Sequence, residues 1–535
     1  MHDSSPIFNR RALLRGSAAL GVMGALSGCV NPTDPSVVSD ELTERAAGKP
    51  NRGGVLRYGL STDTSDLEPH VSTGSASNTV KQLIYNSLLK YDDNGDIVGD
   101  LATDFGFSDP KTYEVTIHRG VKFHDGSTLT VDDVVFTIER IMDEKTAATD
   151  ASQYADVTRV EAIGADKVVF HLRQPNVVLP HALASASSPI VSKAWIEKGV
   201  DPRTQTMGTG PFRLVERVPG VSITLKRFDE YFEDGLPYLN GIQFLPMEDD
   251  YARVSALRSA VVDFIDYVPP THLDVLTKAR GVRIASDSTF GFGYVGFVLG
   301  RKPLRDIRVR QAFAYGIDRK AVLQTAFLDH GEPMTGGLLA KGMLGYDPDL
   351  ADRYPYDPDR AKSLLRKAGF GKLDIDMVTT SSYSVIDRPA QGMLPSLRGS
   401  GEDTKLVRQE WLTFRKTVEA KTFPTHAWGT AIEHSDPDAL SVVLGSDSPN
   451  AQYLEFKDER IDSLLAQGRR ETDEGKRADI YREVENRTLD LLPWTYTVRR
   501  VQAEAMRDYV KGYAHPRKGA WTQTALRKVW LERRE

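Results

Sequence analysis

Two segments in the first third of the chain alternate apolar and polar residues, and both predict half-buried β-strands. The segments are YEVTIHR and VVFHL. Successive side chains of a strand point to opposite faces, so every second residue faces the core. The residues predicted to face the core are Tyr113, Val115, Ile117, Val168, Phe170 and Leu172.

An amphipathic helix is predicted between these two strands. Thr130 precedes VDDVVFTIERIM, and Asp133 stands at the third helical position, which is typical of a capped helix start. Val134, Ile138 and Ile141 recur at helical spacing. These three residues define the face of the helix that packs on the core.

Two longer helical patterns lie further along the chain. The segment DIRVRQAFAYGIDRKAVLQTAF aligns Val309, Phe313 and Ile317 on one face, which predicts one helix. The segment DEGKRADIYREVENRTLDLLP aligns Ile480 and Val484 before a proline ends the pattern. Strand and helix signals alternate throughout, and no internal repeat is present. The fold class predicted is therefore mixed α/β with several sheets.

Length and charge narrow the class of protein. A chain of 535 residues predicts two or three packed units. The formal net charge is −6, and because residues 1–28 carry three Arg and one Asp, the remainder has −8. A mildly acidic chain argues against nucleic acid as a partner.

The N-terminus has the pattern of an export signal. In NRRALLRGSAALGVMGALSGC a basic stretch precedes a short apolar run, which at residues 17–28 is too short to span a membrane. Arg10 and Arg11 resemble the twin-arginine motif, although Asn9 stands where Ser or Thr is commoner. We therefore predict a signal peptide over residues 1–28.

The only cysteine of the chain, Cys29, follows Leu-Ser-Gly and resembles the lipidated residue of a lipobox. We therefore predict that Cys29 carries a lipid anchor. Two or three acyl chains would hold the protein stably on a membrane. Residues 29–52 lack apolar periodicity and contain Pro, Ser and Asp, so they predict a tether.

Motifs of catalysis are weak in this sequence. Residues Gly291–Gly296, GFGYVG, fit the dinucleotide pattern G-x-G-x-x-G, but strand-like sequence follows where that motif needs a helix. Ser87 and Lys90 fit S-x-x-K without its companion motifs, and QLIYNSLL predicts an amphipathic helix there. The histidines are scattered. We predict no catalytic residues, no metal site and no cofactor.

Five ordered segments resemble the peptide-binding lipoproteins and periplasmic proteins that serve ABC importers, the oligopeptide, dipeptide and nickel group of solute receptors. The first reads LATDFGFSDPKTYEVTIHRGVKFHDGSTLTVDDVVFTIER, and another, RDIRVRQAFAYGIDR. The last, KLVRQEWLTFRKTVEAKTF, looks closest to the oligopeptide receptors. The segments are residues 101–140, 208–216, 227–244, 305–319 and 405–423.

This resemblance implies an α/β, two-lobed periplasmic-binding-protein fold (type II, cluster C) with an inserted subdomain. The lobes close over a ligand by a hinge motion. The glycines of GFGYVG then belong to a crossover strand, where they permit close packing. The segments implied are residues 53–86, 206–295 and 498–535 for the first lobe, 87–205 for the inserted subdomain and 296–497 for the second lobe.

The resemblance also implies an anchor for a ligand ammonium. Oligopeptide and dipeptide receptors place an aspartate at the position of Glu433, three residues before Asp436. A buried ammonium needs such a carboxylate partner, and Glu433 keeps the charge on a longer arm. A solvated loop acid is the alternative. Thr430 and Ala427 stand where the oligopeptide receptors often have Trp and Arg, so the match is incomplete.

Four more ligand-binding residues are expected from the resemblance. Trp411 matches a pocket tryptophan of the family, and core packing is the alternative role. Thr73, Gly74 and Ser75 match the first-lobe loop that faces the ligand, and a surface turn with no ligand role is the alternative.

The function predicted is a monomeric, lipid-anchored, extracytoplasmic receptor without enzymatic activity. It would deliver a peptide or peptide-like amine to an ABC permease and ATPase complex. Relatives on the same scaffold take nickel chelates, opines, haem or sugars, so these cargoes stay open. An exported hydrolase and a sensor or chaperone-like lipoprotein are the alternatives from other classes.

Overall fold

The structure is a computed structural model that describes residues 49–71, 74–288, 290–430, 432, 434–517 and 523–532. Residues 46–535 form one compact unit. The predicted signal peptide, Cys29 and most of the predicted tether lie outside the described residues. Within the described part of the chain, no helix is long and apolar enough to cross a membrane.

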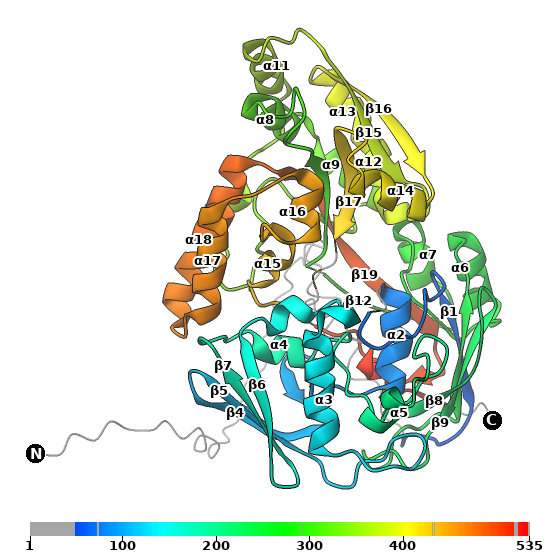
Figure 1. Ribbon diagram of the computed structural model, residues 1–535. Coiled ribbons are helices and arrows are strands. Elements are labelled where there is room, and N and C mark those ends of the chain that lie inside the picture. Colours follow the sequence, from blue (N-terminus) through cyan, green and yellow to red (C-terminus); the bar gives the residue numbers. More distant parts are fainter. Residues whose placement is uncertain are drawn as a thin grey trace, which may run out of the picture. The chain divides into compact units, whose positions relative to one another are not determined.

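An eight-stranded sheet forms the core of the first lobe (Figure 1). Its order is β12-β19-β11-β1-β10-β9-β8, and β14 pairs with β19. The bounds are β1 Val55–Leu60, β8 Phe212–Val218, β9 Ser222–Arg227, β10 Gly241–Pro246, β11 Phe264–Ile265, β12 Val282–Ser288, β14 Gly331–Pro333 and β19 Val498–Arg507.

Helices cover both faces of this sheet because alternate strand residues are apolar on each side. Helix α2 packs on one face and helices α6 and α7 on the other. In β19, Met506 lies in the cluster with α2, whereas Ala503 and Ala505 lie in the cluster with α6 and α7. The elements are α2 Ser75–Ile84, α6 Asp250–Arg258, α7 Leu273–Thr277, η3 Pro270–His272 and η4 Thr524–Lys528.

The second lobe is built on a five-stranded sheet with the order β16-β15-β17-β13-β18. Its strands are β13 Phe292–Phe297, β15 Leu373–Thr380, β16 Glu402–Gln409, β17 Thr425–Thr430 and β18 Trp494–Tyr496. Its helices are α8 Ile307–Gly316, α9 Arg319–Phe327, α10 Pro348–Ala351, α11 Pro358–Lys367, α12 Ser384–Gly392, α13 Leu394–Gly399, α14 Trp411–Glu419, α15 Ala439–Leu444, α16 Pro449–Leu454, α17 Glu459–Arg470 and α18 Glu474–Leu491.

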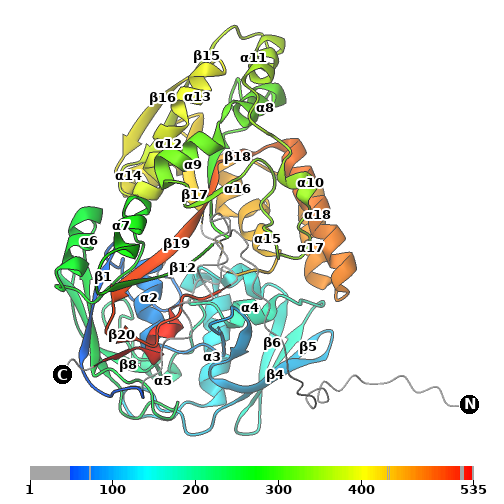
Figure 2. The same ribbon diagram turned by 180° about the vertical axis from the view of Figure 1, so that it is seen from behind.

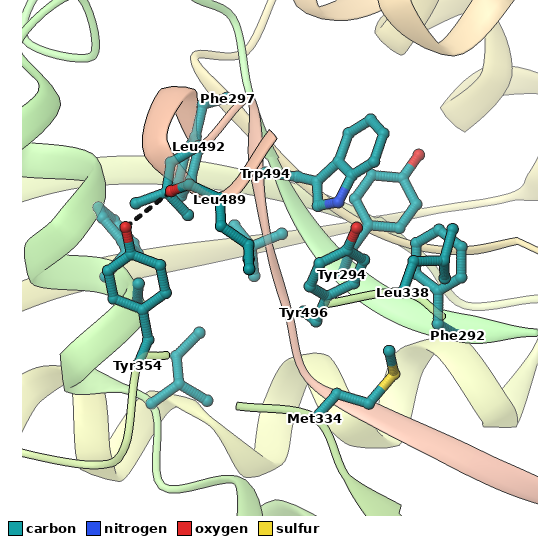
Figure 3. Packing of buried hydrophobic residues seen from close by; sticks show 14 of the residues in the cluster. Phe292, Tyr294, Phe297, Met334, Leu338, Tyr354, Leu489, Leu492, Trp494 and Tyr496 are labelled. Atoms are coloured by element: carbon teal, nitrogen blue, oxygen red, sulfur yellow. Dashed lines mark hydrogen bonds between the residues drawn. The ribbon is translucent and has the colours of Figure 1, made fainter. Parts of the chain in front are cut away.

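The core of the second lobe is rich in aromatic side chains (Figure 3). Phe292 meets Tyr496 edge to face, with ring centroids 5.2 Å apart. The hydroxyl of Tyr354 donates a hydrogen bond of 2.7 Å to the carbonyl of Leu489, so this buried polar atom is satisfied.

A four-stranded sheet, β4-β5-β7-β6, forms the core of the inserted subdomain. The strands predicted from YEVTIHR and VVFHL are confirmed as β5 and β7, and the six residues predicted to face the core are buried. The elements are β4 Ala102–Asp109, β5 Thr112–Ile117, β6 Val157–Ile163, β7 Lys167–Leu172, α3 Val131–Met142, α4 Leu179–Leu183, α5 Lys193–Glu197, η1 Glu144–Thr146 and η2 Ala151–Tyr154.

Two two-stranded ladders complete the described strands. They pair β2 with β3 and β20 with β21. The bounds are β2 Leu89–Tyr91, β3 Ile97–Gly99, β20 Val510–Lys511 and β21 Trp530–Leu531.

The predicted helix α3 is confirmed together with its cap. The backbone N–H of Thr130 donates to Asp133 Oδ2 at 2.9 Å. Val134, Ile138 and Ile141 are fully buried, as their spacing predicts. The predicted C-terminal helix is confirmed as α18, with Val484 fully buried and Ile480 partly buried against the core.

The single helix predicted around Val309 and Phe313 is wrong, because the chain forms two helices there. Helix α8 ends at Gly316, and Asp318 starts α9 by accepting a hydrogen bond from the N–H of Ala321 at 3.0 Å. Ile317 is fully buried at the break, so the apolar pattern continues while the helix does not.

The helix predicted for QLIYNSLL is wrong after Ile84, where α2 ends. Gly208 and Gly210 pack on this end so closely that an added Cβ would lie 2.1 Å and 2.6 Å from the carbonyl oxygen of Ile84. Ser87 donates a hydrogen bond to the carbonyl of Ser185 at 3.0 Å. The GTGPF segment therefore stops the helix by tertiary contact.

Two antiparallel chain segments connect the lobes. Strand β12 pairs with β19 in the first sheet, and β13 pairs with β18 in the second. Between these ladders, the N–H of Thr497 donates to the carbonyl of Gly293 at 2.8 Å. The change of sheet falls between β12 and β13, a few residues before the predicted boundary after residue 295. We propose this segment as the boundary of the first lobe.

Gly293 and Gly296 of GFGYVG lie in β13, and Gly291 directly precedes it. The interpretation as a strand rather than a nucleotide loop is therefore confirmed. An added Cβ at Gly293 would lie 2.6 Å from Thr497 Oγ1. At Gly296 it would lie 2.5 Å from His426 Nε2. Close packing between neighbouring strands therefore requires glycine at both positions.

Candidate ligand-binding cleft

Helix α12 of the second lobe reaches across to the first lobe. The hydroxyl of Ser384 donates to Asp250 Oδ2 at 2.9 Å. Arg388 Nη1 donates to Thr271 Oγ1 at 3.3 Å. Both contacts join residues from different lobes, so they can form only when the lobes are closed on this side.

An aromatic cluster lies beside this contact. Trp411, the first residue of α14, meets Tyr383 edge to face at 4.9 Å and Trp428 at 5.6 Å. Trp428 stacks on Tyr453 with ring centroids 6.0 Å apart. Burial raises the pKa of Tyr383, and a hydrogen bond with Thr62 of the first lobe opposes that shift. The cluster therefore lies where the second lobe contacts the first.

Asp436 and Arg477 fix the chain that follows β17. Arg477 donates to both oxygens of Asp436, at 2.7 and 2.8 Å. Burial by itself would raise the pKa of Asp436, but the hydrogen bonds from Arg477 lower it to about 2. A paired carboxylate of this kind holds the turn at Asp436 in one position.

A buried polar network lies in the first lobe close to the crossover strands. Glu504 of β19 is fully buried and bonds His515 Nδ1. Burial by itself would lower the pKa of His515, but Glu504 raises it above its usual value. Gln502 donates to Glu504 Oε1 at 3.2 Å, and the guanidinium of Arg500 lies 5.1 Å from the ring centre of Tyr267. These polar side chains lie on or beside β19, one of the two segments that connect the lobes.

A second connection joins the second lobe to the inserted subdomain. The N–H of Val177 donates to the carbonyl of Arg469 at 2.9 Å. Beside it, the ring of His181 stacks on that of His434 with centroids 4.5 Å apart. No sequence pattern links these two histidines, because they are far apart in the chain.

The sequence and the fold match one family of known proteins. A family model described as bacterial extracellular solute-binding proteins, family 5 middle, matches residues 96–452. That match spans more than half of the chain. The chain belongs to the family 5 bacterial extracellular solute-binding proteins.

Several family 5 relatives are similar over nearly the whole chain. The oligopeptide-binding protein AppA of Bacillus subtilis is 26% identical, covering 96% of this chain and 98% of the relative. The glutathione-binding protein GsiB of Pectobacterium atrosepticum is also 26% identical, covering 83% and 88%. Both relatives are named as binding proteins.

Solved structures support the two-lobed fold. The binding protein AgaA of A. tumefaciens R10, in complex with agropinic acid, has a TM-score of 0.83 at 31% identity and covers 90% of this chain and 99% of its own. AppA of Bacillus subtilis in complex with a nonapeptide has a TM-score of 0.81 at 24% identity, covering 91% and 100%. The predicted family and fold class are therefore confirmed.

The ligand-binding residues predicted for this family 5 protein stay predictions. Glu433 and Thr73 lie outside the described residues. Gly74 is exposed, with φ of 99°, and precedes α2, of which Ser75 is the first residue. Trp411 is partly buried in the aromatic cluster, which is compatible with packing and with lining the cleft. The structure brings Trp411 beside Tyr383 and Trp428, which sequence reasoning did not predict.

Among the described residues, no group of three or more His, Cys, Asp or Glu side chains is placed to hold a metal ion.

Proposed function

We propose that the protein is a membrane-tethered receptor that captures a peptide or peptide-like cargo between its lobes and delivers it to an ABC importer. One observation carries the proposal: two paired crossover segments join the lobes, while α12 bonds the first lobe at Asp250 and Thr271. A hinge with contacts that form on closure is what a solute receptor needs.

Export and anchoring are part of this proposal. Arg10 and Arg11 would direct the chain to twin-arginine export, and Cys29 would carry the lipid. The permease and ATPase complex would then meet a receptor held at the membrane surface.

A peptide or peptide-like cargo has a free amine that would pair with the carboxylate of Glu433. The relatives named for oligopeptide and glutathione binding, and the structure of AppA with a nonapeptide, support this class. A buried ammonium is stable only beside a fixed negative group.

An opine is the second candidate cargo. The structure of AgaA with agropinic acid is 31% identical to this chain. The departures at Thr430 and Ala427 from the oligopeptide receptors also favour a cargo other than a long peptide. Agropinic acid therefore belongs in any binding assay.

Calorimetry at pH 7.5 tests the function with five probes: Met-Leu, the tetrapeptide STSA, glutathione, agropinic acid and Ni(L-His). We expect one class to bind, to raise thermal stability by about 2.7 kcal/mol at a hundredfold excess over Kd, and to be recovered unchanged. Chemical conversion of the bound probe at a rate proportional to protein would exclude a receptor. Failure of all five to bind would contradict the cargo classes proposed.

A further inference from the structure

Two histidines form the contact between the inserted subdomain and the segment that follows β17. His181 lies in α4 and His434 lies between β17 and α15. Their rings stack with centroids 4.5 Å apart and an angle of 29° between the planes. Both views show α4 below α15 and α17 (Figures 1 and 2). The pair therefore spans the boundary between two parts of the molecule.

The groups that face this pair are few. Tyr91 of β2 bonds His181 Nδ1 through its hydroxyl at 2.8 Å. Asp436 Oδ2 lies 3.7 Å from His181 Nε2, but Arg477 of α18 already pairs with this carboxylate. His434 Nδ1 is buried and bonds no other group in the described part of the chain.

The surroundings of both rings favour their neutral form. Burial and, to a smaller extent, the neighbouring His181 lower the pKa of His434 to about 3, while Asp436 opposes that shift. Burial also lowers the pKa of His181, while Asp436 opposes that shift. A solvated histidine protonates near pH 6.5. Protonation of both rings would place like charges in contact at a partly buried interface, which is costly.

The histidine pair lies next to the residue predicted to bind the cargo. His434 follows Glu433, the predicted partner of the cargo ammonium, directly in the sequence. Asp436, two residues after His434, is paired with Arg477 of α18. Through His181, the inserted subdomain thus contacts residues 434–436, which directly follow Glu433 and are called the cargo segment below.

We propose that the stacked rings of His181 and His434 are a pH-sensitive clasp, which keeps the inserted subdomain on the cargo segment at neutral pH and releases it on acidification. The inference rests on the proposed function, since the clasp is useful only if cargo lies between the lobes. Closure then carries its own dependence on external pH.

The size of the effect follows from proton linkage. A histidine that is neutral when closed and titrates at about 6.5 when open weakens closure about tenfold between pH 7.5 and pH 5.5. Two such histidines weaken it up to about a hundredfold. Cargo affinity changes by the same factor when binding requires closure.

The test compares cargo affinity at pH 7.5 and pH 5.5 by calorimetry on the full chain, with whichever of Met-Leu, STSA, glutathione or agropinic acid binds. We expect a tenfold to hundredfold loss on acidification for the unaltered protein. His181→Phe keeps a ring that can stack but cannot protonate, so its loss should be at least threefold smaller. His434→Gln is a second variant with the same expectation.

His171→Phe is the matched control, because His171 lies in the same subdomain and pairs with Glu161 on the surface. It should lose as much affinity as the unaltered protein. Equal pH dependence in His181→Phe and the unaltered protein would overturn the clasp, as would affinity that is the same at both pH values.

Histidine NMR tests the clasp independently of cargo. The ring signals that disappear in His181→Phe and His434→Gln should titrate clearly below pH 6.5 in the unaltered chain. Titration of both near pH 6.5 would overturn the clasp. Binding of none of the probes together with depressed titration would refute the cargo proposal and leave the clasp supported.

Discussion

A buried carboxyl group in the second lobe makes stability depend on pH. Glu402 is fully buried, and neither carboxyl oxygen has a hydrogen-bond partner among the described residues. An added Cβ at Gly316 would lie 3.2 Å from Glu402 Oε2, so the backbone of α8 encloses the group. Burial raises the pKa of Glu402 to about 8.

The sign and size of the effect follow from proton linkage. Because the folded pKa is above the ordinary value of 4.5, the native state holds the proton more tightly than the unfolded chain. The contribution of Glu402 to the free energy of unfolding is therefore fully present below about pH 4.5 and is lost as the pH rises to about 8. About 3.5 pH units at about 1.36 kcal/mol each correspond to an upper limit of about 5 kcal/mol.

Urea unfolding of Glu402→Gln and of the unaltered protein at pH 5, 7 and 9 measures the contribution of Glu402 to the free energy of unfolding. The amide keeps the shape and cannot ionise, so the variant should match the unaltered protein at pH 5 within about 1 kcal/mol. At pH 9 it should be more stable by several kcal/mol. Other buried acids, such as Glu485 with a pKa raised by burial to about 7, titrate in both proteins and cancel in the difference.

Asp403→Asn is the matched control in the next position of β16. A hydrogen bond from Lys372 lowers the pKa of Asp403, which lies on the surface. Its replacement should change the free energy of unfolding little and should not alter the loss of stability above pH 5. A difference between Glu402→Gln and the unaltered protein that stays constant from pH 5 to pH 9 would refute a protonated Glu402.

Three further predictions concern the cargo, the anchor and the second-lobe sheet. Glu433→Gln should weaken binding of a cargo with a free amine by about thirtyfold or more and leave its N-acetylated form unaffected, and calorimetry of both ligands on both proteins measures the coupling. Cys29→Ala should abolish palmitate labelling, and labelling that persists would contradict the lipid anchor. Gly296→Ala should lower the free energy of unfolding, measured with urea, by about 1 to 3 kcal/mol, because its Cβ would lie 2.5 Å from His426 Nε2. Gly371→Ala, where an added Cβ meets nothing within 4 Å, should change it little.

Local periodicity was sufficient to predict helices and strands whose buried face and ends are set by their own residues. The two strands around Val115 and Phe170, the helix at Ile138 and the helix at Val484 formed where the pattern predicted them. In each, the buried face and the ends are encoded by residues within the element, so no distant contact had to be known.

The ends of other elements depended on distant residues. The helix at Ile84 stops because Gly208 and Gly210 occupy the space at its end. The break at Ile317 is invisible to periodicity, since this residue is buried on the same side as Val309 and Phe313. Packing against distant residues decides where such helices end. The sequence of the helix itself does not contain this information.

The sequence alone determined the α/β class, and its resemblance to known receptors identified the family and proposed Glu433 as the anchor. Tertiary structure decided which side chains meet around that segment. The stack of His181 on His434 and the pairing of Asp436 with Arg477 join residues from separate elements. Contacts of this kind arise only when the chain folds back on itself, because no local pattern records which distant surfaces will share a boundary.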